Sequence, residues 1–279
     1  PALGGLIYAV AQRWLPTLVT PAASRTPYNY GTVAAYGIVI LLVVMAISCV
    51  LFIGAKPAAG NHNQETLRQR LAAGLRFVFK DQVILGALSL DMFAVFFGGA
   101  VALLPIFAEK ILTVGPGDWH LLQDGTVRLG LLRAAPSVGA ALMGLVLAHR
   151  PPLYNTGRKL FAYVAGFGLC MILFAVSRNF YLSFGLLVAS GALDAMSVVI
   201  RGTILQLMVP EDMRGRVLAV NSIFVGSSNE IGSFESGVAA RLMGLVPSVV
   251  FGGAMTLGVV AAMTRFAPKL RDFELAKVA

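Results

Sequence analysis

The sequence is poor in charge and in the residues that form disulfides or bind metals. Only 13% of its 279 residues are charged, whereas soluble domains carry roughly a quarter. The two cysteines, Cys49 and Cys170, both fall inside apolar runs, which favours simple packing over a disulfide framework. The three histidines, His62, His120 and His149, are isolated in predicted loops or at the end of a predicted span. A soluble domain, a disulfide scaffold and a metal site are therefore all disfavoured.

The features of a nucleic-acid-binding protein and of an enzyme are also lacking. The net charge is +9, but nucleic-acid binding needs such charge on one face of a soluble domain. No Ser-His-Asp set, fixed acid pair or metal cluster is evident, so the sequence offers no candidate catalytic site. We therefore expect no nucleic-acid partner, no enzymatic activity and no metal or organic cofactor.

What the sequence has instead is apolar length. Hydrophobic residues make up 57% of the chain and the mean hydropathy is +0.80. A helix needs about 20 predominantly apolar residues to cross a bilayer, and seven runs meet that need. These are residues 30–55, 83–107, 129–148, 160–177, 180–208, 217–240 and 246–266. They predict an all-α fold, a polytopic helical membrane protein.

Charge within these runs follows a rhythm of three. Residues 30–55, 160–177 and 242–264 contain no Asp, Glu, Lys or Arg. The runs between them do carry charge, at Asp91, Arg133, Asp194, Arg201, Glu230 and Glu235. Charge in hydrocarbon is costly and is retained mainly where it faces a bundle interior or a wet cavity. An uncharged outer wall at every third span is expected of a transporter built from three-helix repeats.

Lysine and arginine are divided unequally between the alternate sets of connecting segments. One set, which includes the C-terminal tail, holds fourteen of them, and the other set holds six. The richer set consists of Lys56, Arg68, Arg70, Arg76, Lys80, Arg150, Arg158, Lys159, Arg214, Arg216, Arg265, Lys269, Arg271 and Lys277. Because short loops rich in Lys and Arg face the cytoplasm, we predict a cytoplasmic C-terminus.

Two carboxylates, Asp91 and Asp194, lie near the middle of predicted spans. Among apolar groups the charged form of a carboxylate is disfavoured, which suits proton exchange. The alternative is that each carboxylate locks helices together through hydrogen bonds to Ser or backbone groups. Arg201 follows Asp194 by two helical turns, so both point the same way without touching. Arg201 either serves the same cavity or extends toward the cytoplasmic surface.

The predicted span 217–240 is the most polar of the seven. Glycines interleaved with its serines allow close helix approach, which fits an interface between two sliding halves better than contact with lipid. Glu230 and Glu235 diverge by about 140° on a helix of 3.6 residues per turn, so they are not an acid pair on one face. Before the second span, residues 65–79 form an amphipathic pattern, which predicts a surface connector or a lipid-contacting latch.

Segments spread over nearly the whole chain resemble the major facilitator superfamily of membrane transporters. Pro1-Ala2-Leu3-Gly4-Gly5 is similar to the end of the family's antiporter motif in its fifth helix, Gly-Pro-x-x-Gly-Gly, which Pro1, Gly4 and Gly5 match. Residues 74–78 with 85–91, 131–140, 210–217 and 228–237 resemble, in turn, the entry to helix seven, helix eight, the loop between helices ten and eleven, and helix eleven. The similarity is to the bacterial branch that contains the enterobactin exporter and the transmembrane secretion effectors.

This resemblance implies a partial bundle, with the end of helix five and helices six to twelve, and an N-terminal half-domain missing from the chain. Residues 1–55 then end the N-terminal half, 56–82 form a cytoplasmic linker with an amphipathic helix, 83–266 form the C-terminal six-helix half, and 267–279 form a cytoplasmic tail. Helices seven and ten line the cavity, eight and eleven meet the other half, and six, nine and twelve face lipid. The implied location is the bacterial inner membrane.

The resemblance also assigns residues to cytoplasmic gating. Gly157, Arg158 and Lys159 keep part of the family's gating motif, but the acidic residue that usually precedes its first arginine is absent. The loop between helices ten and eleven contributes Arg214, Gly215 and Arg216.

The implied activity is proton-driven export of small amphipathic molecules, such as siderophores or drugs, by alternating access. Its partners are the lipid bilayer, the small-molecule substrate and protons, and the proton gradient supplies the energy. The residues expected to bind substrate or protons are Asp91, Asp194, Arg201, Glu230 and Glu235. The alternative is a membrane-embedded binding scaffold with no transport activity of its own.

Overall fold

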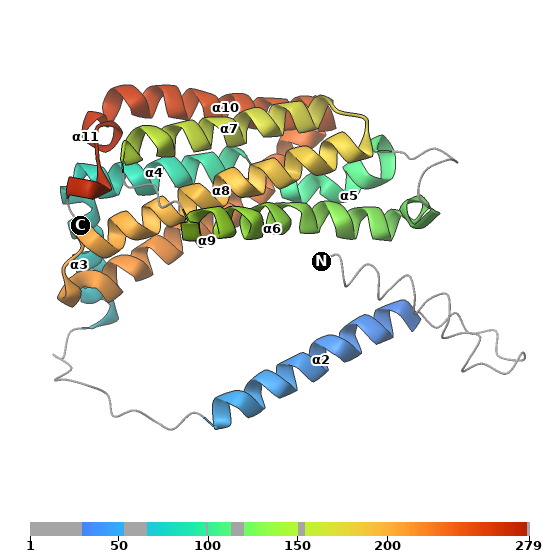
Figure 1. The fold of residues 1–279 in the computed structure, drawn as a ribbon, viewed down its shortest axis with the longest axis horizontal. Helices are drawn as coiled ribbons and strands as arrows, with labels where there is room; N and C mark the ends of the chain where they lie inside the picture. The colour runs from blue at the N-terminus through green and yellow to red at the C-terminus, as the bar shows by residue number, and fades with distance from the viewer. Residues whose placement is uncertain (1–29, 53–65, 99, 113–119, 150–153, 278–279) are drawn as a thin grey trace, which may run out of the picture. The chain divides into compact units, whose positions relative to one another are not determined.

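The computed structural model describes residues 30–52, 66–98, 100–112, 120–149 and 154–277 (Figure 1). The long helices are α2 (Tyr30–Leu51), α3 (Leu67–Lys80), α4 (Gln82–Phe97), α6 (Gly125–His149), α7 (Thr156–Val176), α8 (Phe180–Met208), α9 (Glu211–Met243) and α10 (Leu245–Phe266). The short helices are η1 (Ala100–Leu103), α5 (Leu104–Ile106), η2 (Phe107–Ile111), η3 (His120–Gln123), α11 (Pro268–Arg271) and η4 (Leu275–Lys277). No strand occurs in these ranges, and the all-α prediction is confirmed. Pro1, Gly4 and Gly5 lie outside the described residues.

Six described helical stretches are long and apolar enough to cross a membrane, each within one of the predicted runs or overlapping it. They are Thr32–Leu51, Gln82–Ile111, Gly125–His149, Thr156–Val176, Phe180–Met208 and Leu245–Phe266. The predicted run 217–240 lies in α9, which is too polar to meet the same measure. It is nevertheless one continuous helix of 33 residues that packs against α3, α4 and α10. At 1.5 Å per residue it is about 50 Å long, ample for a span.

The chain divides into two compact units. The first consists of residues 1–64 and 114–134, and the second of residues 65–113 and 135–279. In the first unit, α2 is apolar around its whole circumference and none of its most apolar window is buried. A helix that is hydrophobic on every side is typical of a membrane span. The second unit is the helical bundle that holds the candidate site.

Two clusters of buried apolar side chains hold the bundle together. One joins α4, α7, α8 and α10 and includes Leu90, Phe161 and Val260. The other joins α3, α4, α8 and α9 and includes Val78 and Val217. Since lipid tails are as apolar as these side chains, helices in a membrane associate mainly through the quality of their packing.

Backbone contact replaces side-chain contact where α6 crosses α8. A Cβ atom added at Gly191 would lie 2.1 Å from the carbonyl oxygen of Pro136, and one added at Gly139 would lie 1.9 Å from that of Val188. Neither position can hold a larger residue unless the helices separate. The two glycines therefore set the distance between α6 and α8.

The predicted run 83–107 lies within the candidate span Gln82–Ile111, but the described residues of this span form several helical pieces. Helix α4 ends at Phe97, and Gly98 caps it through a backbone hydrogen bond of 2.8 Å to Ala94. The chain continues as η1, α5 and the single π-helical turn η2. Pro105 lies at the start of α5, where its missing N–H and fixed φ angle are tolerated, whereas within a continuous helix it would remove a hydrogen bond. Glycine and proline together account for the interruption.

The amphipathic segment predicted at residues 65–79 forms helix α3. Its start is fixed by a capping box, in which the Thr66 side chain accepts from the Gln69 N–H and the Gln69 side chain accepts from the Thr66 N–H. Gly74 and Val78 are buried against α9 and the neighbouring helices, while Leu75 is exposed. Helix α3 thus packs on the bundle as a connector.

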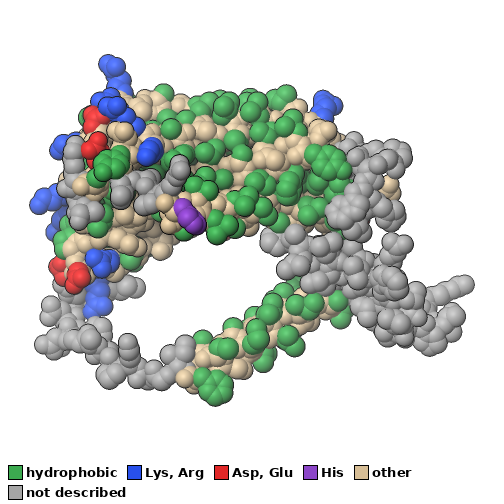
Figure 2. Space-filling model, in the orientation of Figure 1, with side chains coloured by type: hydrophobic (Ala, Val, Ile, Leu, Met, Phe, Trp, Pro, Cys, Tyr) green, Lys and Arg blue, Asp and Glu red, His purple; other side chains and the backbone are tan. Residues whose placement is uncertain are grey.

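Charge is concentrated at the ends of the bundle. On the face in Figure 2, Lys and Arg side chains gather at the end where α3, α11 and the C-terminus lie, while apolar side chains cover the surface between the two ends. This separation is typical of a protein whose middle lies in hydrocarbon and whose ends lie in water.

Candidate functional site

A buried ion pair joins helices α4 and α8. Asp91 of α4 is 5% exposed and Arg201 of α8 is 7% exposed, and Nη1 of Arg201 contacts Oδ2 of Asp91. Nε of Arg201 also donates to the backbone oxygen of Ser197 at 3.3 Å. The alternative in which Arg201 extends to the cytoplasmic surface is therefore wrong. Its charge is held inside the bundle by a carboxylate from another helix.

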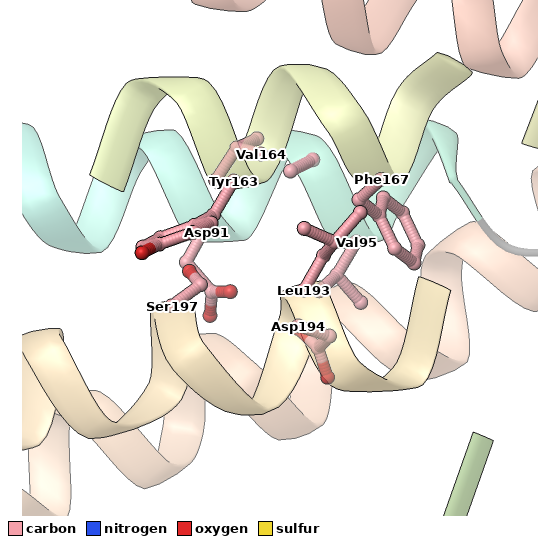
Figure 3. Close-up of a pocket in the computed structure, with 9 residues that line it drawn as sticks. Asp91, Val95, Tyr163, Val164, Phe167, Leu193, Asp194 and Ser197 are labelled. Carbon is pink, nitrogen blue, oxygen red and sulfur yellow. The ribbon is translucent and has the colours of Figure 1, made fainter. Parts of the chain in front are cut away.

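A narrow pocket lies beside this pair, between α4, α7 and α8. Figure 3 shows Asp91, Tyr163 and Ser197 gathered at one end of it, and Val95, Phe167, Leu193 and Asp194 at the other. The two carboxylates line the same pocket but occupy different ends. Asp91 and Asp194 therefore line one pocket, while their roles in binding substrate or protons stay predictions.

Asp194 is the opposite of Asp91 in its surroundings. Its side chain is exposed, and no hydrogen-bond or ion-pair partner reaches it from the described part of the chain. It lines the narrow pocket and also a larger cavity next to it. One carboxylate is thus neutralised by an arginine, while the other is available to whatever enters the cavity.

The larger cavity has a volume of about 260 Å³ and lies where α4, α6, α7, α8 and α9 come together. Small-molecule sites are concave, mostly apolar and oriented by a few polar groups, and this lining has that character. The lining residues are Val95, Gly98, Ala100, Val101, Pro136, Phe167, Met171, Leu187, Ser190, Gly191, Asp194, Asn229 and Ser233.

Helix α9 reaches this cavity with residues other than those predicted. Asn229 and Ser233, one turn apart, line it. Glu230 is exposed and Glu235 is partly buried, and neither lines the cavity. A role for Glu230 and Glu235 in binding substrate or protons stays a prediction. The i, i+4 spacing of Asn229 and Ser233 could have indicated which face of α9 lines the cavity. The prediction relied instead on the nearby acidic residues.

The predicted gating residues of the second unit hold the C-terminal segment. The N–H of Gly157 donates to the carbonyl oxygen of Phe273 at 3.0 Å, and the N–H of Leu275 donates to Oγ1 of Thr156 at 3.2 Å. Leu270 and Leu275 are almost fully buried in the core cluster of α4, α7, α8 and α10. We call residues 267–275 the C-terminal clasp. The segment predicted as a cytoplasmic tail is thus folded against the bundle.

Charge reinforces the clasp on its outer side. Nη2 of Arg158 lies 3.3 Å from Oδ1 of Asp272, and Nη2 of Arg271 lies 3.0 Å from Oδ2 of the same carboxylate. Hydrogen bonding from Arg271, and then from Arg158, holds the pKa of Asp272 below its usual range. Arg158 of the gating motif thus has an acidic partner in the C-terminal clasp. Lys159 begins the second turn of α7, where its N–H bonds to Asn155.

The other predicted gating residues, Arg214, Gly215 and Arg216, were expected in a loop. They lie on the first turns of α9. Nη2 of Arg214 donates to the backbone oxygen of Gln206 at 3.3 Å, tying α9 to the end of α8. Nη1 of Arg216 contacts the sulfur of Met213 at 3.7 Å. Gly215 has open space beside it. Within the described ranges no group of His, Cys, Asp or Glu is arranged to hold a metal ion.

Comparison with known proteins agrees with this architecture. Residues 28–279 match the sequence profile of the family described as transmembrane secretion effector. The chain belongs to this family. It is thus a multi-pass membrane protein of the major facilitator superfamily, in the exporter branch that its motifs resemble, and its family consists of transporters rather than enzymes.

Curated relatives extend the match over almost all of the chain. The enterobactin exporter EntS of Escherichia coli O1:K1 is 24% identical over 273 residues, which cover 98% of this chain and 58% of that protein. EntS of Citrobacter koseri is 24% identical over 253 residues, covering 91% and 53% respectively. The chain spans a little over half the length of these relatives. No solved structure matches it significantly.

Proposed function

We propose that the protein is a secondary active exporter that moves small amphipathic molecules out of the cell by alternating access, driven by proton entry. The observation that carries the proposal is the pairing of Asp91 with Arg201 beside the unpaired Asp194. Membership in the family of transmembrane secretion effectors and similarity to enterobactin exporters support the direction of transport. The proposed location is the bacterial inner membrane with the C-terminus in the cytoplasm, as the excess of Lys and Arg favours.

The ion pair gives proton entry a way to act on the helices. Asp91 and Arg201 come from α4 and α8, so their attraction ties these two helices together. A proton on Asp91 removes the negative charge that holds Arg201, and the tie between the helices weakens. Asp194 faces the substrate cavity and takes up either a proton or the substrate. Competition of this kind couples proton movement to substrate release.

The available energy is sufficient for export. One elementary charge that crosses a membrane potential of 100 mV gains about 2.3 kcal/mol. Since 1.4 kcal/mol corresponds to a factor of ten, one proton supports a concentration ratio of roughly fifty. No chemical reaction at the site is required.

Transport in inside-out membrane vesicles tests the proposal. Vesicles from cells that express the protein should accumulate enterobactin or a fluorescent dye when their interior is acidified, and a protonophore should abolish accumulation. The variants Asp91→Asn and Asp194→Asn should each reduce the initial rate at least tenfold, while Glu211→Gln, an exposed acid at the start of α9, should not. Accumulation that persists with the protonophore would show that protons are not coupled.

The same assay separates the alternative of a scaffold without transport. No accumulation of any compound by well-folded, membrane-inserted protein would support the scaffold. Full activity in both aspartate variants would leave export standing but remove the site assignment.

A further inference from the structure

The cavity carries a net negative charge. Asp194 is the one ionisable side chain among its described lining residues. Arg201 is the nearest cationic candidate on the same helix, but its guanidinium is committed to Asp91 and to the backbone of Ser197. The described lining residues include no Lys or Arg. The single charge of Arg201 faces two carboxylates, Asp91 and Asp194, so a ligand that enters the cavity meets a carboxylate without a direct cationic partner.

The neutral polar groups of the cavity present more acceptors than donors. Oγ of Ser190 donates to Leu187 at 2.8 Å, and Oγ of Ser233 donates to Asn229 at 2.7 Å. The side-chain nitrogen of Asn229 donates to the carbonyl oxygen of Val225 at 2.9 Å. A hydroxyl that has given its proton to its own helix keeps only lone pairs for a ligand. The second N–H of Asn229 is the one side-chain donor left among these three residues, so they favour a ligand that brings its own N–H or O–H donors.

The interruption of α4 adds to the same field. The helix ends at Phe97 with Gly98 as its cap, and Gly98 lines the cavity. The last carbonyl groups of a helix lack intrahelical partners and form the negative end of its dipole. In transporters, half-helix C-terminal ends inside the membrane contribute to cation sites. The C-terminal end of α4 and the carboxylate of Asp194 thus both favour a positively charged ligand.

The apolar part of the lining accepts the body of such a ligand. Phe167, Met171 and Leu187 line the same cavity. The face of an aromatic ring attracts cations within about 6 Å, and methionine adapts to ligands of varied shape. A volume of about 260 Å³ suits a small molecule and not a peptide.

We propose that this cavity binds amphipathic monocations, in which an ammonium or amidinium group pairs with Asp194 and the apolar body packs on α7 and α8. Carboxylates, sulfonates and deprotonated catechols of the same size are disfavoured by charge and by the scarcity of donors. This inference rests on the proposed function, because it takes the cavity as the substrate site. It narrows the substrate from amphipathic molecules in general to basic ones.

Three matched probes test the charge preference without any ion gradient. Each carries a dansyl fluorophore on the same alkyl chain, which ends in an ammonium, a methyl or a carboxylate group. Binding to the purified, detergent-solubilised protein is followed by fluorescence at pH 7. We expect the ammonium probe to bind at least tenfold more tightly than the methyl probe, and the carboxylate probe more weakly than both, since hydrogen bonds to charged groups are worth more than neutral ones.

The variant Asp194→Asn identifies the residue responsible. It should weaken binding of the ammonium probe roughly tenfold and leave the methyl probe unchanged, while Glu211→Gln should alter neither. Equal binding of all three probes by the wild-type protein, or unchanged ammonium binding by well-folded Asp194→Asn, would overturn the inference. If Asp194→Asn does not fold, the order of the three probes on the wild-type protein still decides.

Failure of the inference and failure of the proposed function are distinguishable. Selective binding of the ammonium probe without proton-driven accumulation in vesicles would keep the cation site and reject the exporter. Proton-driven accumulation of enterobactin together with no preference for the ammonium probe would keep the exporter and reject the cation site.

Discussion

The N–H of Gly157 donates a hydrogen bond of 3.0 Å to the carbonyl oxygen of Phe273. This bond joins the first turn of α7 to a segment more than a hundred residues later, next to the ion pair between Arg158 and Asp272. Leu270 and Leu275 are buried on either side of it. The C-terminal clasp is therefore a packed part of the bundle, and the gating motif is its binding site.

Substitution Gly157→Ala should open the C-terminal clasp. A Cβ atom at this position would lie 1.8 Å from the carbonyl oxygen of Leu270, so the clasp must move away. We expect a loss of about 1–3 kcal/mol in stability, as for other overpacked sites. Trypsin should then cut rapidly after Lys269 and Arg271 in a protein that carries a C-terminal tag. Gly258→Ala, where a Cβ meets open space, is the matched control; equal cleavage of both variants would contradict the prediction.

Attachment of the C-terminal clasp should depend on pH only in the acid range. Arg271 and Arg158 hold the pKa of Asp272 below its usual range, so its ion pairs contribute fully above about pH 4, near the value of an unstructured Asp. The contribution falls as pH drops through the lowered pKa. Hydrogen-exchange protection of the Gly157 amide should be constant from pH 8 to pH 5 and fall below about pH 4. Loss of protection near pH 6 would show that another group controls the clasp, and Asp272→Asn should remove the acid step.

Removal of either partner of the buried ion pair should destabilise the bundle unequally. Asp91→Leu leaves Arg201 buried and charged, because arginine does not release its proton in proteins, and should cost about 3–5 kcal/mol. Arg201→Met should cost less, since a lone Asp91 can become neutral by binding a proton. Thermal unfolding in detergent measures both. The double variant Asp91→Leu/Arg201→Met should recover most of the stability without recovering transport. If both single variants are as stable as the wild type, the ion pair between Asp91 and Arg201 does not stabilise the bundle.

Substitution Gly191→Ala should push α8 away from α6. The added methyl group would lie 2.1 Å from the carbonyl oxygen of Pro136, which is backbone and cannot turn aside. We expect a loss of about 1–3 kcal/mol and a smaller substrate response, because Gly191 also lines the cavity. Gly185→Ala lies on the same helix with open space around it and should be neutral or slightly stabilising. Similar melting temperatures for the two variants would contradict the close crossing.

Much of the architecture could be predicted from apolar runs and charge spacing. The helices α2, α7, α8 and α10 occupy the runs expected of them, because about 20 apolar residues in water-free surroundings have few alternatives to a helix. The end of α4 was missed, although Gly98 and Pro105 are residues that commonly mark such ends. The sequence stays apolar on both sides of Gly98 and Pro105, so hydropathy alone does not predict a helix boundary there.

The spacing of residues in the sequence could not predict which helices contact each other. Periodicity placed Asp194 and Arg201 on one side of α8, but it gave no register between α8 and α4, so the partner of Arg201 could not be named. Asn229 and Ser233 were likewise seen as polar without being assigned to the cavity. The C-terminal clasp left little signal, since Leu270 and Leu275 stand among charged residues. In each case the decisive information is which helix lies opposite.

The cap at Gly98 also has a mechanical meaning. An unbroken helix resists bending along its whole length because every turn is hydrogen-bonded to the next, whereas short turns joined by a glycine and a proline resist it only locally. The stretch from Ala100 to Ile111 is therefore held in place by its own buried side chains, such as Leu104 and Phe107, rather than by helical continuity with Gln82–Phe97. Side-chain packing thus sets the position of this stretch relative to α4, and the cavity that Asp194 lines lies beside the point where the two meet.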